Sequence, residues 1–312
     1  MVATIVLGEA NVINDGANNK LVYNFPNSVS FPNHEIAIQS IYMYYSWENI
    51  NTNPLNNDFF YIYWPTSPYT TGTLPTASAV KVSIPEGLYE IATLNQYLQW
   101  FSIKYGYYLI NAAGENVYYW EFIINPALYG VQLNLYPVPT SLPSGWTAPT
   151  ANVVLGTAAF AGFPASATSP QVFIPSNNNF YKIVGFPAGS ILPSTASAIN
   201  FSYVSPLSPQ VQPNPVVFLQ LSNIENNYAN PSSILGVISP QVGFGELIQE
   251  VPPQFAWNKL LPGTYNSLRL SFVGTDKSQI KILDPQMTIT LVIRDKKDVS
   301  LTDAVSNATG GK

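Results

Sequence analysis

The chain has 312 residues and a formal net charge of -5, and only 9% of its residues are charged. Its 12 Lys and Arg residues are spread from Lys20 to Lys312 without a cluster, which argues against direct nucleic-acid binding. The sequence contains no cysteine, and this excludes a disulfide framework, a thiolate zinc site and a thiol nucleophile.

Charge is scarcest in the middle of the chain. Between Phe122 and Ile224 the only charged side chain is Lys182, whereas soluble domains average about a quarter charged residues. Asn, Ser, Thr, Tyr and Pro are abundant, so the predicted surface is polar without being ionic. Hydroxyl and amide groups that find a partner cost much less to bury than ions do. This composition favours close-packed assembly with other protein over catalysis.

The N-terminal segment carries one short apolar run, Thr4 to Leu7, which Gly8 and Glu9 interrupt at once. That run is too short for a signal peptide or a membrane span, and we expect neither. Residues 1–18 show no sustained apolar pattern, so we expect a flexible N-terminal arm there.

Alternation of apolar with polar residues predicts half-buried β-strands along most of the chain. β-branched and aromatic residues dominate these segments, as is typical of strands. The expected strands are residues 21–25, 36–45, 59–63, 80–84, 117–124, 131–135, 216–221, 268–272 and 287–294. In the second of them the apolar phase slips between Ile38 and Ile41, which predicts a β-bulge.

A single segment has the spacing of a helix. Apolar residues recur at intervals of three and four at Ile91, Leu94, Leu98, Phe101 and Tyr105. We expect this helix to pack across one end of a sheet.

The connections between the predicted strands hold most of the 27 prolines. Small and turn-forming residues are abundant in a region of about residues 137–170, whose outer limit is residue 210. Trp146 and Phe160 are isolated anchors within it. We expect a loop-rich insertion there. The predicted fold class is all-β: a single jelly-roll β-sandwich with one short helix and this insertion. The jelly-roll domain is expected over residues 19–295, with a flexible C-terminal tail at 296–312.

Motifs of hydrolytic chemistry are weak in this sequence. His34 is the only histidine, and the pair His34-Glu35 lacks the second histidine of an H-E-x-x-H zinc motif. A serine triad would need His34 as its base, but no G-x-S-x-G elbow occurs, and Ser176 and Ser190 lie in ordinary turn contexts. The stretch 243–246 matches only the opening of a glycine-rich nucleotide fingerprint, so a tight turn is the favoured interpretation.

Carboxylates beside aromatic residues are the remaining candidates for catalysis. A glycosidase needs two of them, and Glu115, Glu121, Glu246 and Glu250 lie near aromatic residues that could stack on sugars. Nothing in the sequence brings any two to the required separation. We therefore expect no enzyme, no cofactor, and no catalytic, cofactor-binding or metal-binding residues.

A series of segments along residues 20–295 carries a pattern more specific than strand periodicity. In order they are IAIQSIYMYYSWENI (36–50), IPEGLYEI (84–91), VYYWEFIINP (117–126), YGVQL (129–133), SPQVQP (208–213), NNY (226–228), FGE (244–246), GTYNSL (263–268) and ILD (282–284). This ordered set resembles the penton, or minor capsid, proteins of virophages and Polinton (Maverick)-type viruses. Residues 137–170 do not follow the pattern.

The resemblance implies a viral structural protein, a penton capsid protein that forms homopentamers at the five-fold vertices of an icosahedral capsid. Its expected neighbours are double-jelly-roll major capsid proteins, and its expected location is the virion, assembled inside the host cell. A host or giant-virus surface receptor is left open as a further partner. We expect the neutral loops between Phe122 and Ile224 to supply much of the subunit contact and outward surface, and the two arms to tether the vertex.

A carbohydrate- or receptor-binding β-sandwich module is the alternative function. The aromatic clusters at residues 42–47 and 118–120 could line a glycan groove, and a jelly roll would suit that role equally well. Core or interface positions are the favoured interpretation of both clusters.

Overall fold

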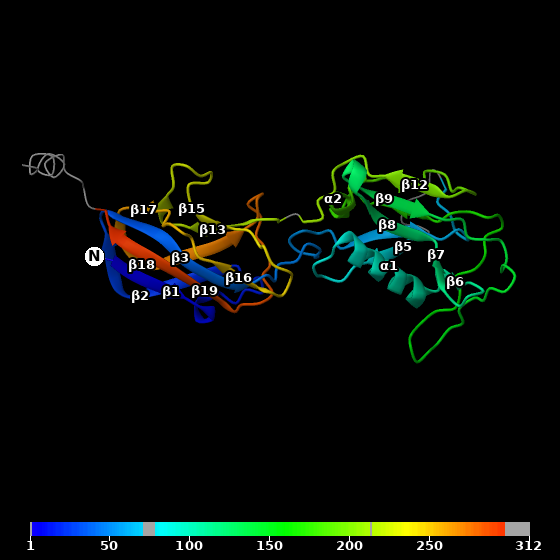
Figure 1. The fold of residues 1–312 in the computed structure, drawn as a ribbon, viewed down its shortest axis with the longest axis horizontal. Coiled ribbons are helices and arrows are strands. Elements are labelled where there is room, and N and C mark those ends of the chain that lie inside the picture. Colours follow the sequence, from blue (N-terminus) through cyan, green and yellow to red (C-terminus); the bar gives the residue numbers. More distant parts are fainter. Residues whose placement is uncertain (1, 71–78, 213, 297–312) are drawn as a thin grey trace, which may run out of the picture. The chain divides into compact units, whose positions relative to one another are not determined.

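The structure is a computed structural model that describes residues 2–70, 79–212 and 214–296 (Figure 1). The chain forms two compact units: unit 1 comprises Met1–Trp47 and Asn214–Lys312, and unit 2 comprises Glu48–Pro213. In the described residues of both units, strands are the commonest regular structure, which confirms the predicted all-β class. The tail predicted at 296–312 lies outside the described residues, apart from Lys296.

Unit 1 consists of two antiparallel sheets. Its elements are β1 (Val2–Leu7), η1 (Glu9–Asn11), β2 (Lys20–Phe31), β3 (His34–Tyr44), β13 (Val217–Leu221), β14 (Ile224–Glu225), β15 (Ile234–Ile238), β16 (Leu247–Glu250), β17 (Asn258–Leu260), β18 (Gly263–Val273) and β19 (Met287–Asp295). One sheet has the order β1-β19-β3-β17-β14, with β16 also paired to β3, and the other has the order β15-β13-β18-β2. The long strands β3, β18 and β19 run through the left-hand part of Figure 1.

The order in which the chain visits these sheets is that of a jelly roll. Apart from the short strands β14 and β17, which both join the sheet of β3, the strands β1, β2, β3 and β13 alternate between the two sheets, β15 pairs with β13, and β16, β18 and β19 alternate again. The first and last strands, β1 and β19, are neighbours, as are β2 and β18. Two interlocked Greek keys have this connectivity. The predicted jelly-roll sandwich is therefore confirmed for unit 1.

Side chains that face inward from both sheets form the core of unit 1. The fully buried members include Leu7, Leu21, Ile36, Ile41, Met43, Leu219, Leu221, Leu268, Phe272, Ile289 and Leu291. The β3–β19 register shifts between Thr290 and Leu291, opposite Ser40 and Ile38. This irregularity is the predicted bulge, and it lets the residues on both sides of it point into the core.

The N-terminal segment differs from the expected flexible arm. Residues 2–7 form β1, which pairs along its length with β19, and Ile5 and Leu7 are buried. A strand at the edge of a sandwich buries only alternate side chains, so two inward residues suffice to fix it. A run this short does not register as a sustained apolar pattern in the sequence.

Unit 2 has its own sheets and two helices. Its elements are β4 (Phe59–Tyr63), β5 (Val80–Ser83), α1 (Ile91–Tyr105), β6 (Tyr108–Ile110), β7 (Asn116–Tyr118), β8 (Trp120–Asn125), η2 (Pro126–Leu128), β9 (Gly130–Leu135), β10 (Gln171–Phe173), α2 (Phe180–Val184), β11 (Ile191–Leu192) and β12 (Phe201–Val204). The strand orders are β11-β10-β4-β5, β12-β9-β8 and β6-β7. The short helix α2 was not predicted.

Helix α1 has the predicted position and packs against β8, a strand of the sheet β12-β9-β8 (Figure 1). Its buried face includes Leu94, Leu98 and Phe101, which join one continuous apolar core with residues of both larger sheets. The helix ends at Gly106, which has the left-handed φ of 75° that a helix C-cap favours.

The boundaries of the insertion also differ from the expectation. The predicted loop-rich region, 137–170, is one part of unit 2, which begins at Glu48 and ends at Pro213. It is largely irregular, and its anchors Trp146 and Phe160 pack on the unit 2 core. The sequence could not separate the units because strands of either one show the same two-residue period. Unit 2 is thus inserted into the connection between β3 and β13 of the jelly roll.

Candidate functional site and interaction surfaces

The residues weighed for a serine triad take part in local structure. His34 is at the start of β3 in unit 1, and its Nε2 lies 2.7 Å from Oδ1 of Asp295 on the paired strand β19. Ser176 and Ser190 belong to unit 2, and the Ser190 hydroxyl donates to the Pro187 carbonyl oxygen at 2.6 Å. These contacts give His34 and Ser190 structural roles at a strand pair and a turn.

The carboxylates weighed for glycosidase chemistry also have local partners. Glu115 accepts from the Asn111 side chain at 3.0 Å, within the turn between β6 and β7. Glu246 accepts from the Gly243 N–H at 2.8 Å and closes a turn in which Gly245 has a φ of 83°. The 243–246 segment is therefore the tight turn that was favoured, and Glu250 follows it on the strand β16.

Glu121 lies on the outward side of the sheet β12-β9-β8, within a row of neutral polar groups. Its Oε1 accepts from Nδ2 of Asn134 at 2.9 Å, and Asn134 in turn accepts from the hydroxyl of Ser202 at 2.9 Å. Gln132 donates to Asn134 at 2.9 Å and accepts from Asn125 at 3.0 Å. We call these five residues the polar ladder. Amide and hydroxyl groups make up all of it except one carboxylate.

The polar ladder also perturbs a neighbouring tyrosine. The Tyr136 hydroxyl donates to the Glu121 carboxylate at 2.7 Å. Burial, followed by this hydrogen bond and the negative charge of Glu121, raises the pKa of Tyr136 to about 12. The phenol therefore stays neutral, and the outward face of this sheet carries hydrogen-bonding groups with very little charge.

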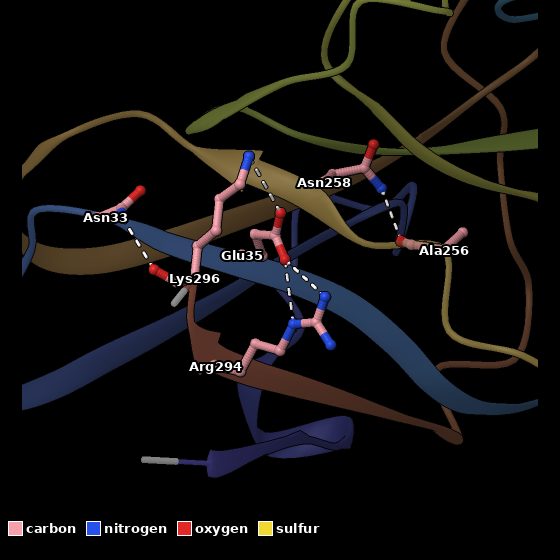
Figure 2. A network of polar contacts seen from close by, with 6 residues as sticks. All are labelled: Asn33, Glu35, Ala256, Asn258, Arg294 and Lys296. Carbon is pink, nitrogen blue, oxygen red and sulfur yellow. Dashed lines mark hydrogen bonds and ion pairs between the residues drawn. The ribbon is translucent and has the colours of Figure 1, made fainter. Parts of the chain in front are cut away.

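The one dense group of charges in the described part of unit 1 lies where β3 begins and β19 ends. Figure 2 shows Glu35 accepting from Nε and Nη2 of Arg294, at 3.0 and 2.8 Å, with the Lys296 ammonium 3.7 Å away. Asn33 donates to the Lys296 carbonyl oxygen at 3.0 Å, and the Arg294 guanidinium lies 3.9 Å from the centre of the Trp257 ring. This network joins the two strand ends to the segment before β17, and it has no reacting centre.

Exposed apolar side chains are a more informative feature of the surface. Residues 153–155 form a loop tip in which Val153 and Val154 are each 94% exposed and Leu155 is 73% exposed. A second group lies at the β8–β9 turn, where Leu128 and Tyr129 are 66% and 76% exposed. Consecutive exposed apolar residues are uncommon on proteins that stay alone in solution, and they mark contact surfaces.

A hollow of about 540 Å³ is present on unit 2. Its lining comprises Pro65, Thr66, Pro68, residues 163–168, Ala196 and Ala198, so it contains no charged side chain. Its size falls within the range of about 300–1,000 Å³ that is usual for binding clefts. Proline and alanine make up most of this lining, and Thr66, Ser166 and Thr168 add hydroxyl groups.

Metal ions and membranes are two further kinds of partner. Among the residues that the structure describes, no three His, Cys, Asp or Glu side chains are grouped so that they could hold a metal ion. Within the same residues, no helix combines the length and the apolar character that crossing a bilayer requires.

Comparisons with known proteins give a structural likeness. No protein-family model and no curated protein sequence matches the chain. Among solved structures, the chain is similar to the penton protein of mavirus, with a TM-score of 0.38 and 9% sequence identity. The alignment covers 95% of this chain and 99% of the mavirus chain.

Proposed function

We propose that this chain is a penton protein, a structural protein that occupies the five-fold vertices of an icosahedral capsid as a homopentamer. Its location would be the virion, and its neighbours at the vertex would be double-jelly-roll major capsid proteins. The mavirus protein to which the chain is similar is likewise a penton protein. The mechanism of such a protein is assembly and involves no turnover of substrate.

The observation that carries the proposal is a jelly roll combined with a surface that has almost no charge. Viral capsid and lectin domains are the common uses of the jelly roll. Unit 2, inserted between β3 and β13, contains nearly all of the stretch from Phe122 to Ile224, whose only charged residue is Lys182. A subunit packed against copies of itself leaves little free surface, so it needs few charges for solubility. The ordered sequence segments that resemble pentons support the same role.

The structure assigns specific groups to that neutral surface. Ser202 exposes a hydroxyl at one end of the polar ladder, and the loop tip at 153–155 exposes aliphatic side chains. Hydroxyl and aliphatic groups can be buried at an interface without the penalty of desolvating an ion. We therefore assign subunit contact and outward surface to the neutral loops and sheet faces of unit 2.

Reconstitution with the major capsid protein of the same virus tests this function. The chain and that protein would be produced together, and the particles imaged by electron cryomicroscopy with and without the chain. We expect five-fold vertices filled with density only when the chain is present. Particles with identical vertices in both preparations would contradict the proposal.

A carbohydrate-binding module is the second candidate, and the polar ladder is the observation that favours it. Glu121 and Ser202, joined through the buried Asn134, place a carboxylate and a hydroxyl in one row across three strands. Such groups can bind sugar hydroxyls. A glycan array would distinguish the two roles: saccharide binding that is lost in Glu121→Ala, together with no incorporation into particles, would favour the module.

A further inference from the structure

The loop tip in unit 2 has an unusual concentration of exposed apolar surface. Residues 152–157, which we call the finger, have the sequence Asn-Val-Val-Leu-Gly-Thr, and the exposed fractions of Val153, Val154 and Leu155 are 94%, 94% and 73%. A single exposed apolar side chain needs no explanation, but three in succession leave a continuous apolar surface in water. A partner that covers this surface would remove it from water, and this would stabilise the complex.

The backbone of the finger is held in a defined shape. Asn152 and Thr157 exchange two backbone hydrogen bonds, at 3.0 and 3.1 Å. The side-chain oxygen of Asn152 accepts from the N–H groups of Val154 and Leu155, at 3.0 and 3.1 Å. Gly156 supplies the left-handed φ of 64° that closes the turn. Because the tip is already ordered, little conformational entropy would be lost when it binds.

The base of the finger is fixed to the end of helix α1. The Ala158 N–H donates to the Lys104 carbonyl, and the Ala161 N–H donates to the Gly106 carbonyl, both at 2.9 Å. Gly106 and Ala159 approach so closely that a Cβ on Gly106 would lie 1.9 Å from the Ala159 carbonyl oxygen. The finger therefore projects from a rigid support.

The hollow of about 540 Å³ on the same unit matches the finger in chemistry. Its lining includes Pro65, Pro68, Phe163, Ala196 and Ala198, and every lining side chain is uncharged. An apolar tip would displace water from such a surface without leaving an ion unpaired. The finger and the described lining of the hollow are thus both uncharged.

We propose that the finger of one copy fills the hollow of the next copy around the vertex. This inference rests on the proposed homopentamer. Since Val153 and Val154 are 94% exposed, the finger does not occupy the hollow of its own chain, and both surfaces are free to contact a second copy. A contact between two different patches of identical subunits is heterologous, and it generates a closed ring when the rotation between subunits is right. Five such contacts would complete a pentamer.

Cysteine cross-linking tests this contact directly, because the natural chain contains no cysteine. The double variant Val154→Cys/Ala198→Cys would be oxidised under mild conditions and separated by non-reducing electrophoresis. We expect a ladder of cross-linked bands on the gel that runs from dimer to pentamer and ends there. Each single variant should stay uncoupled, and a mixture of the two should stop at dimers. The control Val154→Cys/Tyr228→Cys, whose second site is a fully exposed loop residue of unit 1, should give no ladder.

A disruption and rescue experiment separates this contact from the pentamer itself. Val154→Asp should weaken the pentamer at least about tenfold in sedimentation equilibrium, because it would bury an unpaired charge. Tyr228→Asp should leave it unchanged, and adding Ala198→Lys to Val154→Asp should restore association.

The outcomes of these experiments distinguish the two proposals. A wild-type chain that stays monomeric both alone and with the major capsid protein would refute the homopentamer, and with it the proposed function. If the wild-type chain forms a pentamer, but the variant Val154→Cys/Ala198→Cys gives no cross-linked products and Val154→Asp leaves the pentamer intact, the finger contact alone would be refuted. If Val154→Asp instead abolished cosedimentation with phosphatidylcholine vesicles and left the pentamer intact, the finger would be a membrane contact and the inference would be overturned.

Discussion

The two cores predict that the units unfold separately, and a matched pair of phenylalanine variants tests this. Phe180 in unit 2 and Phe272 in unit 1 are both 0% exposed. The Phe180 ring stacks on Phe60 with centroids 4.9 Å apart and lies 6.3 Å from Phe122, whereas Phe272 packs inside the jelly roll. Among the described residues, the members of the apolar core around Phe180 all lie between Ile50 and Val211, within unit 2. Each substitution to Ala should therefore destabilise its own unit.

The expected size follows from the burial of each ring. Removing a fully buried phenylalanine side chain costs about 3–5 kcal/mol. For units of this length, each kcal/mol lowers the melting temperature by about 2–4 °C, so we expect a shift of about 6–20 °C. Differential scanning calorimetry of Phe180→Ala should move one transition, and Phe272→Ala should move the other. Equal movement of both transitions by either variant would refute the description of two independent cores.

Three further predictions concern single sites. Gly106→Ala should destabilise unit 2 more than Gly114→Ala does: both glycines have a left-handed φ, which costs about 1–2 kcal/mol for Ala, but the clash with Ala159 adds about 1–3 kcal/mol only at Gly106. Thermal unfolding of the two variants measures this difference, and equal losses would contradict the close approach. Glu35→Gln should cost unit 1 about 1–3 kcal/mol in urea unfolding, because Glu35 is 13% exposed and makes two hydrogen bonds to a guanidinium. The exposed ion pair between Glu225 and Lys259, 3.6 Å apart, should contribute less than about 1 kcal/mol when tested as Glu225→Gln. A similar loss of stability in Glu35→Gln and Glu225→Gln would be inconsistent with the network in Figure 2. Unit 2 should also lose stability in alkali. Burial is the main cause that raises the pKa of four of its tyrosines to about 12, from 10.0: Tyr63, Tyr97, Tyr119 and Tyr136. Since the folded unit favours the neutral phenols, this stability is complete below pH 10 and is lost as the pH rises towards 12. Melting temperatures measured across that range should fall, and a constant value for the unit 2 transition would contradict the burial of these hydroxyls.

Local periodicity predicted the elements that bury one face along many residues. The strands β3, β18 and β19 and the helix α1 were all expected, because their apolar residues repeat often enough to define a period. Short elements such as β11, β14 and α2 have too few residues for a period to emerge. The bulge in β3 was predictable because an inserted residue shifts the phase of the pattern itself.

Local sequence patterns could not predict contacts between residues that are distant in the sequence. Glu35 and Arg294 are 259 positions apart, and only the pairing of β3 with β19 brings them together. The division into two units has the same origin, since the strand period does not say which sheet a strand joins. The neutral surface, in contrast, followed from composition alone. The sequence also indicates the exposed loop tip, because the three apolar residues Val153-Val154-Leu155 lie between Asn152 and Gly156, and Asn and Gly are both frequent in turns.

Assembly into a five-fold ring is the central claim, and the mass of the protein in solution tests it most directly. Native mass spectrometry and light scattering would be applied to the chain alone and to the chain with the double-jelly-roll major capsid protein that we propose as its partner. We predict a pentamer of five times 34.2 kDa, or a specific complex with that capsid protein. A chain that remains at 34.2 kDa at every concentration and ignores the capsid protein would contradict the assignment to a capsid vertex.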